Sequence, residues 1–174
     1  NTMKKIFTLL ALTISFSMYS QTASTYYGFN TGFHAGEDYN SSFGHLSLNG
    51  NTSGDYNSGF GSNSLRNNNG NYNSAFGSYS LYSNTSGSSN TASGRNSLYF
   101  NTTGSSNTAS GSYSLYYNTT GSSNTASGSY SLVSNTTGYY NTASGYNSLF
   151  DNISGVGNTA FGYQSLISNT TGNY

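Results

Sequence analysis

The chain has 174 residues, of which only 5% are charged, and its formal net charge is zero. This length suits one domain, and the zero net charge leaves no electrostatic footprint for nucleic acid binding. The absence of cysteine excludes disulfides, thiolate catalysis and cysteine-based zinc sites.

The first predicted element is a secretory signal peptide over residues 1–20, which includes two residues upstream of Met3. Lys4 and Lys5 form a basic start, and an apolar run from Ile6 to Met18 follows. This order is typical of a signal peptide, and the run is too short for a good transmembrane helix. We expect cleavage after Ser20, a secreted or cell-surface location and no membrane span in the mature segment. A retained membrane anchor is the alternative.

Residues 21–39 are predicted to be an N-terminal cap or linker, and the few residues suited to acid–base chemistry are concentrated near it. Glu37 and Asp38 are adjacent, so on a strand they would point to opposite faces and form no acid–base pair. His34 and His45 have no recognisable partner motif. We therefore expect no enzyme activity, no catalytic residue, no metal site and no cofactor.

A tandem repeat of 17 residues then fills residues 40–174 and ends within a ninth copy. We number the unit so that Asn101 to Tyr117 are positions 1 to 17. Position 7 is always Asn, position 9 is always small, position 11 is always Gly and position 14 is always Ser. Position 15 is always leucine, at Leu48, Leu65, Leu81, Leu98, Leu115, Leu132, Leu149 and Leu166.

This repeat predicts an all-β fold, a β-solenoid or β-roll of about eight 17-residue coils. The unit is too short for two amphipathic helices, and its Gly, Asn, Ser and Thr content disfavours helix. In a solenoid, each coil pairs its backbone with the coils above and below, so no thick core is needed. Disorder is the alternative for such a polar sequence, although the fixed leucines speak against it.

Within a coil we predict one strand at "NTAS" and a second at "SLYY", as in residues 107–110 and 114–117. Leucine 15 and the small residue 9 should face inward, and positions 8, 10, 14 and 16 outward. The glycines at positions 4 and 11 should adopt turn conformations closed to residues with a Cβ. The position-7 asparagines, among them Asn107, Asn124 and Asn141, should form a ladder of side-chain amides.

Position 10 is phenylalanine in four copies and serine in the other four. Phe43, Phe60, Phe76 and Phe161 would then form an outward row that is unusual for a monomer. We therefore expect a homo-oligomer in which this row packs on another chain.

These residues resemble tandem "NTAxGxxSLxxNTTGxx" arrays of secreted bacterial surface proteins and of phage or virus fibre-like proteins. More distantly, they resemble the head repeats of trimeric autotransporter adhesins. The match covers residues 40–174. The resemblance implies a surface adhesion or fibre protein that binds a host or surface ligand, and a trimer as one possible assembly.

Two outward surfaces are candidate binding sites. Tyrosines recur after the position-11 glycine and should form a stripe able to stack on sugars or on a partner protein. They are Tyr79, Tyr82, Tyr99, Tyr113, Tyr116, Tyr130, Tyr146 and Tyr163, with Tyr117 beside them. A structural role as sheet cover is the alternative. The "TAS" segments, such as Thr108–Ser110, resemble the hydroxyl arrays of ice-binding solenoids. Our leading hypothesis is multivalent adhesion, and the alternatives are a single-chain glycan or ice binder and a viral tail fibre.

Overall fold

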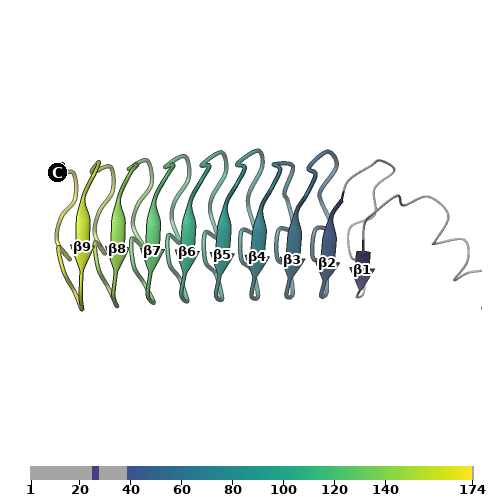
Figure 1. Cartoon of the computed structure of the whole chain (residues 1–174), viewed down its shortest axis with the longest axis horizontal. Coiled ribbons are helices and arrows are strands. Elements are labelled where there is room, and N and C mark those ends of the chain that lie inside the picture. Colours follow the sequence, from purple (N-terminus) through teal and green to yellow (C-terminus); the bar gives the residue numbers. More distant parts are fainter. Residues whose placement is uncertain (1–24, 28–38, 174) are drawn as a thin grey trace, which may run out of the picture.

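The computed structural model describes residues 25–27 and 39–173, and it is a parallel β-solenoid. Coils of about 17 residues stack along one axis, and each contributes one short strand to a single sheet (Figure 1). The predicted fold class is therefore confirmed. The predicted signal peptide, residues 1–20, and the residues from Gly28 to Asp38 lie outside the described part of the chain.

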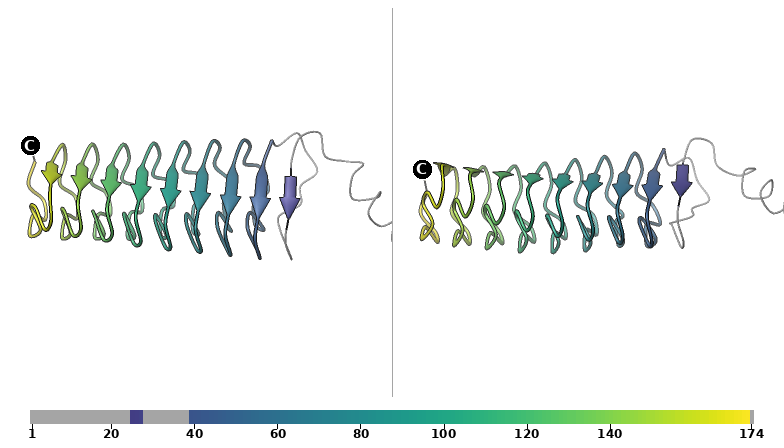
Figure 2. Two further views of the ribbon diagram at one scale, coloured as in Figure 1. Left: turned by 60° about the horizontal axis from the view of Figure 1, so that its bottom comes forward. Right: turned by 90° about the horizontal axis from the view of Figure 1, so that it is seen from below.

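Among the described residues, nine strands of three residues each form the sheet, in chain order and all parallel. The turned views in Figure 2 show the rest of each coil returning on one side of this sheet. The strands are β1 (Thr25–Tyr27), β2 (Ser41–Phe43), β3 (Ser58–Phe60), β4 (Ser74–Phe76), β5 (Thr91–Ser93), β6 (Thr108–Ser110), β7 (Thr125–Ser127), β8 (Thr142–Ser144) and β9 (Thr159–Phe161). Because β1 pairs with β2, the sheet begins one strand before the array that we identified from Asn40.

The register places equivalent repeat positions side by side. Ala109 pairs with Ala92 on one side and with Ala126 on the other. Backbone hydrogen bonds also join the coils outside the strands, for example from Leu115 N to Ser131 O at 3.0 Å. Stacking of the coils thus provides hydrogen-bond partners for the backbone N–H and C=O groups, as expected for a chain without a thick core.

The predicted second strand at "SLYY" is wrong. Tyr113 and Leu115 have φ angles of +58° and +50°, and Ser106 earlier in the coil has +58°. Left-handed residues at positions 6, 13 and 15 bend the chain sharply, so these segments are turns. A left-handed leucine in every coil from Leu48 to Leu166 is costly for an L-residue, and tertiary packing must hold it there.

A thin core lies inside the coils, as predicted. Seven leucines are fully buried, as are the alanines of β4 to β8. The leucines are Leu48, Leu65, Leu81, Leu98, Leu115, Leu132 and Leu149. Leu166 in the last coil differs, because 51% of its surface is exposed. The fully buried leucine column therefore runs from Leu48 to Leu149.

Two asparagine ladders run through the interior, of which we predicted one. In the position-7 ladder, Asn107 Nδ2 donates to Asn90 Oδ1 at 3.2 Å and to Gly121 O at 2.8 Å. In the position-1 ladder, Asn118 Nδ2 donates to Asn101 Oδ1 at 2.8 Å and to the same Gly121 O at 2.9 Å. One glycine carbonyl per coil thus accepts hydrogen bonds from both ladders.

Two further expectations about the coil need correction. The position-14 serines point inward and are fully buried in most coils, for example Ser114, whose hydroxyl donates to Gly111 O at 2.8 Å. Gly111 has a positive φ of +142°, as predicted for position 11. Gly121 at position 4 does not have a positive φ. Its Cβ would instead meet the carbonyl of Gly138 in the next coil, so this position needs glycine because the backbones approach closely.

Candidate functional site

The predicted tyrosines gather into one aromatic surface, which we call the tyrosine stripe. It contains Tyr79, Tyr82, Tyr99, Phe100, Tyr113, Tyr116, Tyr117, Tyr130, Tyr146 and Tyr163. All of these residues follow the position-11 glycine of their coil. Tyr146 and Tyr163 stand at position 12, directly after that glycine, and the others stand at positions 13, 16 or 17.

Ring-to-ring contacts run without interruption along the stripe. Tyr99 lies between Tyr82 and Tyr116, with centroid distances of 5.0 and 5.3 Å. Tyr113 stacks on Tyr130 with a centroid distance of 5.2 Å. Tyr116 lies 5.2 Å from Tyr113 and so links it to Tyr99. Tyr130, Tyr146 and Tyr163 continue the series at 6.1 and 5.7 Å. Such contacts favour a fixed aromatic surface, because each ring supports the next.

The middle of the stripe is half-buried and its edges are open to solvent. Tyr79, Phe100, Tyr117, Tyr146 and Tyr163 are exposed. Burial raises the pKa of the Tyr99 hydroxyl above its ordinary value, and Tyr82 and Tyr79 raise it further. The Tyr99 hydroxyl therefore stays neutral at physiological pH and can both donate and accept a hydrogen bond.

Both arginines of the repeat region lie on the stripe. The guanidinium of Arg66 sits 5.8 Å from the Tyr82 ring centroid, and that of Arg95 sits 5.9 Å from the Tyr113 centroid. Arg66 also donates to Asn63 Oδ1 at 3.2 Å and to the Tyr82 hydroxyl at 3.3 Å. Cation–π contacts of this kind hold both charges against the aromatic surface.

A shallow pocket of about 320 Å³ opens within the stripe. Two position-16 rings, Tyr99 and Tyr116, line it together with Tyr79, Arg95 and Asn96. It thus combines aromatic walls with one cation and one amide, which is the usual make-up of a site that fixes a small polar ligand.

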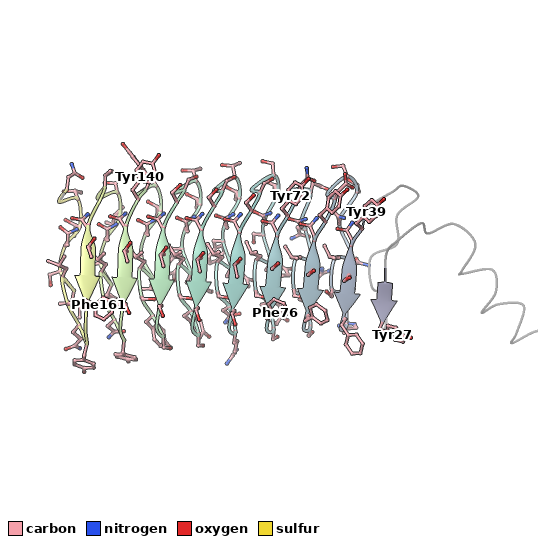
Figure 3. All side chains as sticks on the ribbon, in the orientation of Figure 1. Tyr27, Tyr39, Tyr72, Phe76, Tyr140 and Phe161 are labelled. Atoms are coloured by element: carbon pink, nitrogen blue, oxygen red, sulfur yellow. The ribbon has the colours of Figure 1, made fainter. Side chains whose placement is uncertain are left out.

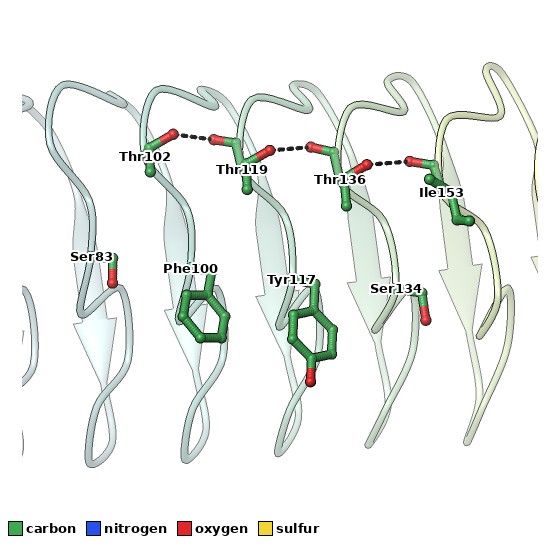
Figure 4. Close-up of a pocket in the computed structure, with 8 residues that line it drawn as sticks. All are labelled: Ser83, Phe100, Thr102, Tyr117, Thr119, Ser134, Thr136 and Ile153. Carbon is green, nitrogen blue, oxygen red and sulfur yellow. Dashed lines mark hydrogen bonds between the residues drawn. The ribbon is translucent and has the colours of Figure 1, made fainter.

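A longer open groove of about 660 Å³ follows the coils beside the stripe (Figure 4). One side is formed by Ser83, Phe100, Tyr117 and Ser134, and the other by Thr102, Thr119, Thr136 and Ile153. The threonine hydroxyls are used within the fold, since each donates to the carbonyl one coil on, at 2.9 to 3.1 Å. The lining of the groove is therefore largely apolar.

A second aromatic surface flanks strands β1 to β4, and we call it the paired aromatic rows. One row is Tyr27, Phe43, Phe60 and Phe76 at position 10, and the other is Tyr39, Tyr56 and Tyr72 at position 6. Neighbouring rings stack at 4.8 to 6.4 Å. Figure 3 shows the two rows at opposite ends of the strands, and Tyr140 and Phe161 repeat these two places near β8 and β9.

Strands β5 to β8 carry a different outward face, which is made of hydroxyl groups. Thr91, Thr108 and Thr125 are exposed, and so are Ser93, Ser110 and Ser127 on the same strands. The alanine between each pair points inward, as predicted for a strand. Phe76 and Phe161 border this hydroxyl face on its two sides.

The described residues contain no group of three or more metal-ligating side chains and no helix that could span a membrane. Asp55 and Asp151 lie in coils far apart along the stack, and His45 is exposed at the N-terminal end of the array. His34, Glu37 and Asp38 lie outside the described part of the chain.

The sequence also contained surface features that we did not predict. Phe100 joins the stripe because position 17 lies beside position 16, as Tyr117 already indicated. The position-6 row was visible as Tyr39, Tyr56 and Tyr72 at a constant phase of the repeat. The role of Arg95 as part of a pocket had no signal, because the pocket forms only where three coils meet.

No protein-family model, curated protein or solved structure matches this chain.

Proposed function

We propose that this protein is a secreted, non-enzymatic surface fibre or adhesin that binds through the tyrosine stripe. The unbroken series of ring contacts from Tyr79 to Tyr163 is the observation that carries this proposal. The resemblance of the repeat to bacterial surface and viral fibre arrays supports the same assignment.

Repetition explains why weak contacts would be sufficient. The successive coils that hold Tyr79 to Tyr163 each present one to three rings about 4.8 Å from the next, so a polymeric ligand can engage several coils at once. After the first contact, each further contact forms at a high effective concentration, and overall avidity rises without new chemistry. A polysaccharide is the fitting ligand, since sugar rings offer apolar faces to tyrosine rings and hydroxyl groups to their oxygens.

Replacing Tyr82, Tyr99 and Tyr116 together with serine is expected to weaken binding to a glycan-coated surface at least tenfold. The change removes the central row of the stripe. The fold should tolerate it, because position 16 is Asn49 or Val133 in other coils. Retention on immobilised polysaccharides, chosen from a glycan array, measures the effect.

The matched control replaces Tyr139 and Tyr140 with serine, which removes two exposed rings that belong neither to the stripe nor to the paired aromatic rows. This control should stay within about twofold of the unmodified protein. Glycan-array and cell-surface binding that are both blank for the unmodified protein would contradict the proposal.

The paired aromatic rows support self-association through the face of β1 to β4. Each of the seven rings exposes roughly half of a side chain of about 200 Å², so together they offer about 700 Å². An interface of standard size buries about 800 Å² per partner. We therefore propose that a second copy of this chain covers the rows, in a dimer or, as in the resembling adhesin heads, a trimer.

Changing Phe43, Phe60 and Phe76 to serine should convert this oligomer to monomer in sedimentation velocity at micromolar concentration. Serine already occupies position 10 in β5 to β8, so the coils should remain folded. The far-ultraviolet circular dichroism spectrum serves as the folding control. An unmodified protein that sediments only as a monomer would rule out the self-association.

The hydroxyl face of β5 to β8 favours a second candidate function, ice binding. Thr and Ser two residues apart on parallel stacked strands form a regular array of small polar groups. Ice-recrystallisation assays should show inhibition that is lost when Thr108 and Thr125 become lysine. Equal recrystallisation with and without the unmodified protein would remove this candidate.

A further inference from the structure

We propose that the pocket around Asn96 binds one acidic sugar unit through its carboxylate. This inference rests on the proposed function, because it names the ligand class that the tyrosine stripe would recognise. Four observations carry it: a missing ring, an unpaired amide, an uncompensated cation and the aromatic walls between them.

The pocket exists because one ring of a tyrosine column is missing. Position 13 is Tyr79, Asn96, Tyr113 and Tyr130 in four successive coils. All four residues share the same left-handed backbone, with φ of +57° or +58°. With coils about 4.8 Å apart, Tyr79 and Tyr113 are separated by about 10 Å, and the smaller asparagine leaves the space between them open.

The Asn96 residue is largely buried, and its side-chain amide has no partner among the described residues. The residue is 9% exposed, and its backbone N–H donates to Ser78 O at 3.0 Å. Its side-chain amide forms no hydrogen bond with any residue among 25–27 and 39–173. The amide therefore opens to the pocket, where it is available to donate to and accept from a ligand.

Asn63 shows that the fold can pair an amide at this position. It occupies the same position 13 and has a similar φ of +58°. Its Nδ2 donates to Ser62 Oγ at 3.0 Å, and its Oδ1 accepts from Arg66 at 3.2 Å. Asn147 at the same position also has an unpaired side-chain oxygen, so what distinguishes Asn96 is that it lines the pocket together with Arg95.

Arg95 supplies a positive charge at the edge of the pocket. Its side chain is exposed, its guanidinium lies over the Tyr113 ring, and no carboxylate within residues 39–173 forms an ion pair with it. The planar guanidinium can donate two parallel hydrogen bonds to one carboxylate. A cation held beside aromatic rings without a protein counter-charge suits an anionic ligand.

Together these groups match a sugar acid. The apolar face of a pyranose ring can pack on Tyr99 and Tyr116, while its carboxylate pairs with Arg95. The Asn96 amide can donate to and accept from neighbouring sugar hydroxyls. A pocket of about 320 Å³ has room for one such unit, and its open sides allow a polymer chain to continue along the stripe.

The test measures binding of the whole chain to immobilised polygalacturonate, with neutral dextran and dextran sulfate as reference polymers. We expect binding to polygalacturonate, and we expect Asn96→Tyr and Arg95→Gln each to reduce the affinity at least tenfold. Asn96→Tyr restores the tyrosine column seen at Tyr113, so the coil should fold, and circular dichroism checks this.

Two matched controls separate the pocket from general effects of charge and ring number. Thr103→Glu lowers the net charge by one, as Arg95→Gln does, and Ser106→Tyr adds a ring at position 6, where Tyr72 stands in an earlier coil; both residues are exposed and lie outside the stripe. Both should stay within about twofold of the unmodified protein.

Three outcomes would overturn the proposal. The first is no binding of the unmodified protein to polygalacturonate. The second is equal or stronger binding to dextran sulfate or neutral dextran, which would assign the stripe to another ligand class. The third is full binding by Asn96→Tyr. If the serine variant of Tyr82, Tyr99 and Tyr116 loses binding while Asn96→Tyr keeps it, the stripe binds without the pocket, so the proposed function survives and this inference fails.

Discussion

Replacing Gly111 with alanine is expected to destabilise the solenoid by at least about 4 kcal/mol, at the extreme of single substitutions. Gly111 has a φ of +142°, which L-residues rarely adopt. A Cβ there would also lie 2.5 Å from the backbone C and O of Gly128 in the next coil. Neither backbone can move away alone, because hydrogen bonds on both sides fix the coil spacing. Urea unfolding followed by circular dichroism measures the loss.

Gly162 provides the matched control, because it holds the same repeat position in the last coil. Its φ is +113°, but an added Cβ would meet no atom within 4 Å. Gly162→Ala should therefore show only the conformational cost, about 1–3 kcal/mol. Equal losses for the two variants would mean that coil stacking at position 11 is not the reason for the glycine.

Replacing Asn124 with leucine should cost about 4 kcal/mol, although the two side chains are similar in size. Asn124 Nδ2 donates to Asn107 Oδ1 at 3.2 Å and to Gly138 O at 2.8 Å. Its Oδ1 accepts from the backbone N–H and the Nδ2 of Asn141, at 3.0 and 3.1 Å. Leucine would remove all four bonds and leave the buried Asn141 N–H without an acceptor.

The loss of these hydrogen bonds should also weaken the coupling between the coils on either side of residue 124, because each coil is stabilised mainly by its neighbours. Native-state hydrogen exchange should show faster exchange in the coils beside Asn124 than in distant ones. Asn67→Leu is the control, since Asn67 is exposed at position 17 and lies outside both ladders. A change of less than about 1 kcal/mol in Asn124→Leu would show that the ladder is not a main source of stability.

Some of the features behind these predictions could be predicted from the sequence, and others could not. The period of Leu115 and its equivalents, the small residue at position 9 and the invariant Asn124 column predicted the coil, the core and one ladder. Repetition makes such inferences strong, because a residue that recurs at every coil must satisfy the same environment each time.

The path within the coil was less predictable. "SLYY" has strand-forming composition, yet Leu115 takes a left-handed conformation so that its side chain reaches the interior. Ser114 turns inward because its hydroxyl can bond to the Gly111 carbonyl. Both choices follow from tertiary contacts that override local propensity.

The same division holds for the surface. The sequence by itself determined that tyrosines recur after the position-11 glycine, and hence that rings from successive coils form a stripe. Only the tertiary structure decided that Tyr79, Arg95 and Tyr116 border one pocket with Asn96 buried in it. The physical reason is that these residues come from three stacked coils. Their meeting depends on the turn geometry of each coil and on one ring being absent, and neither is written in the spacing of any single motif.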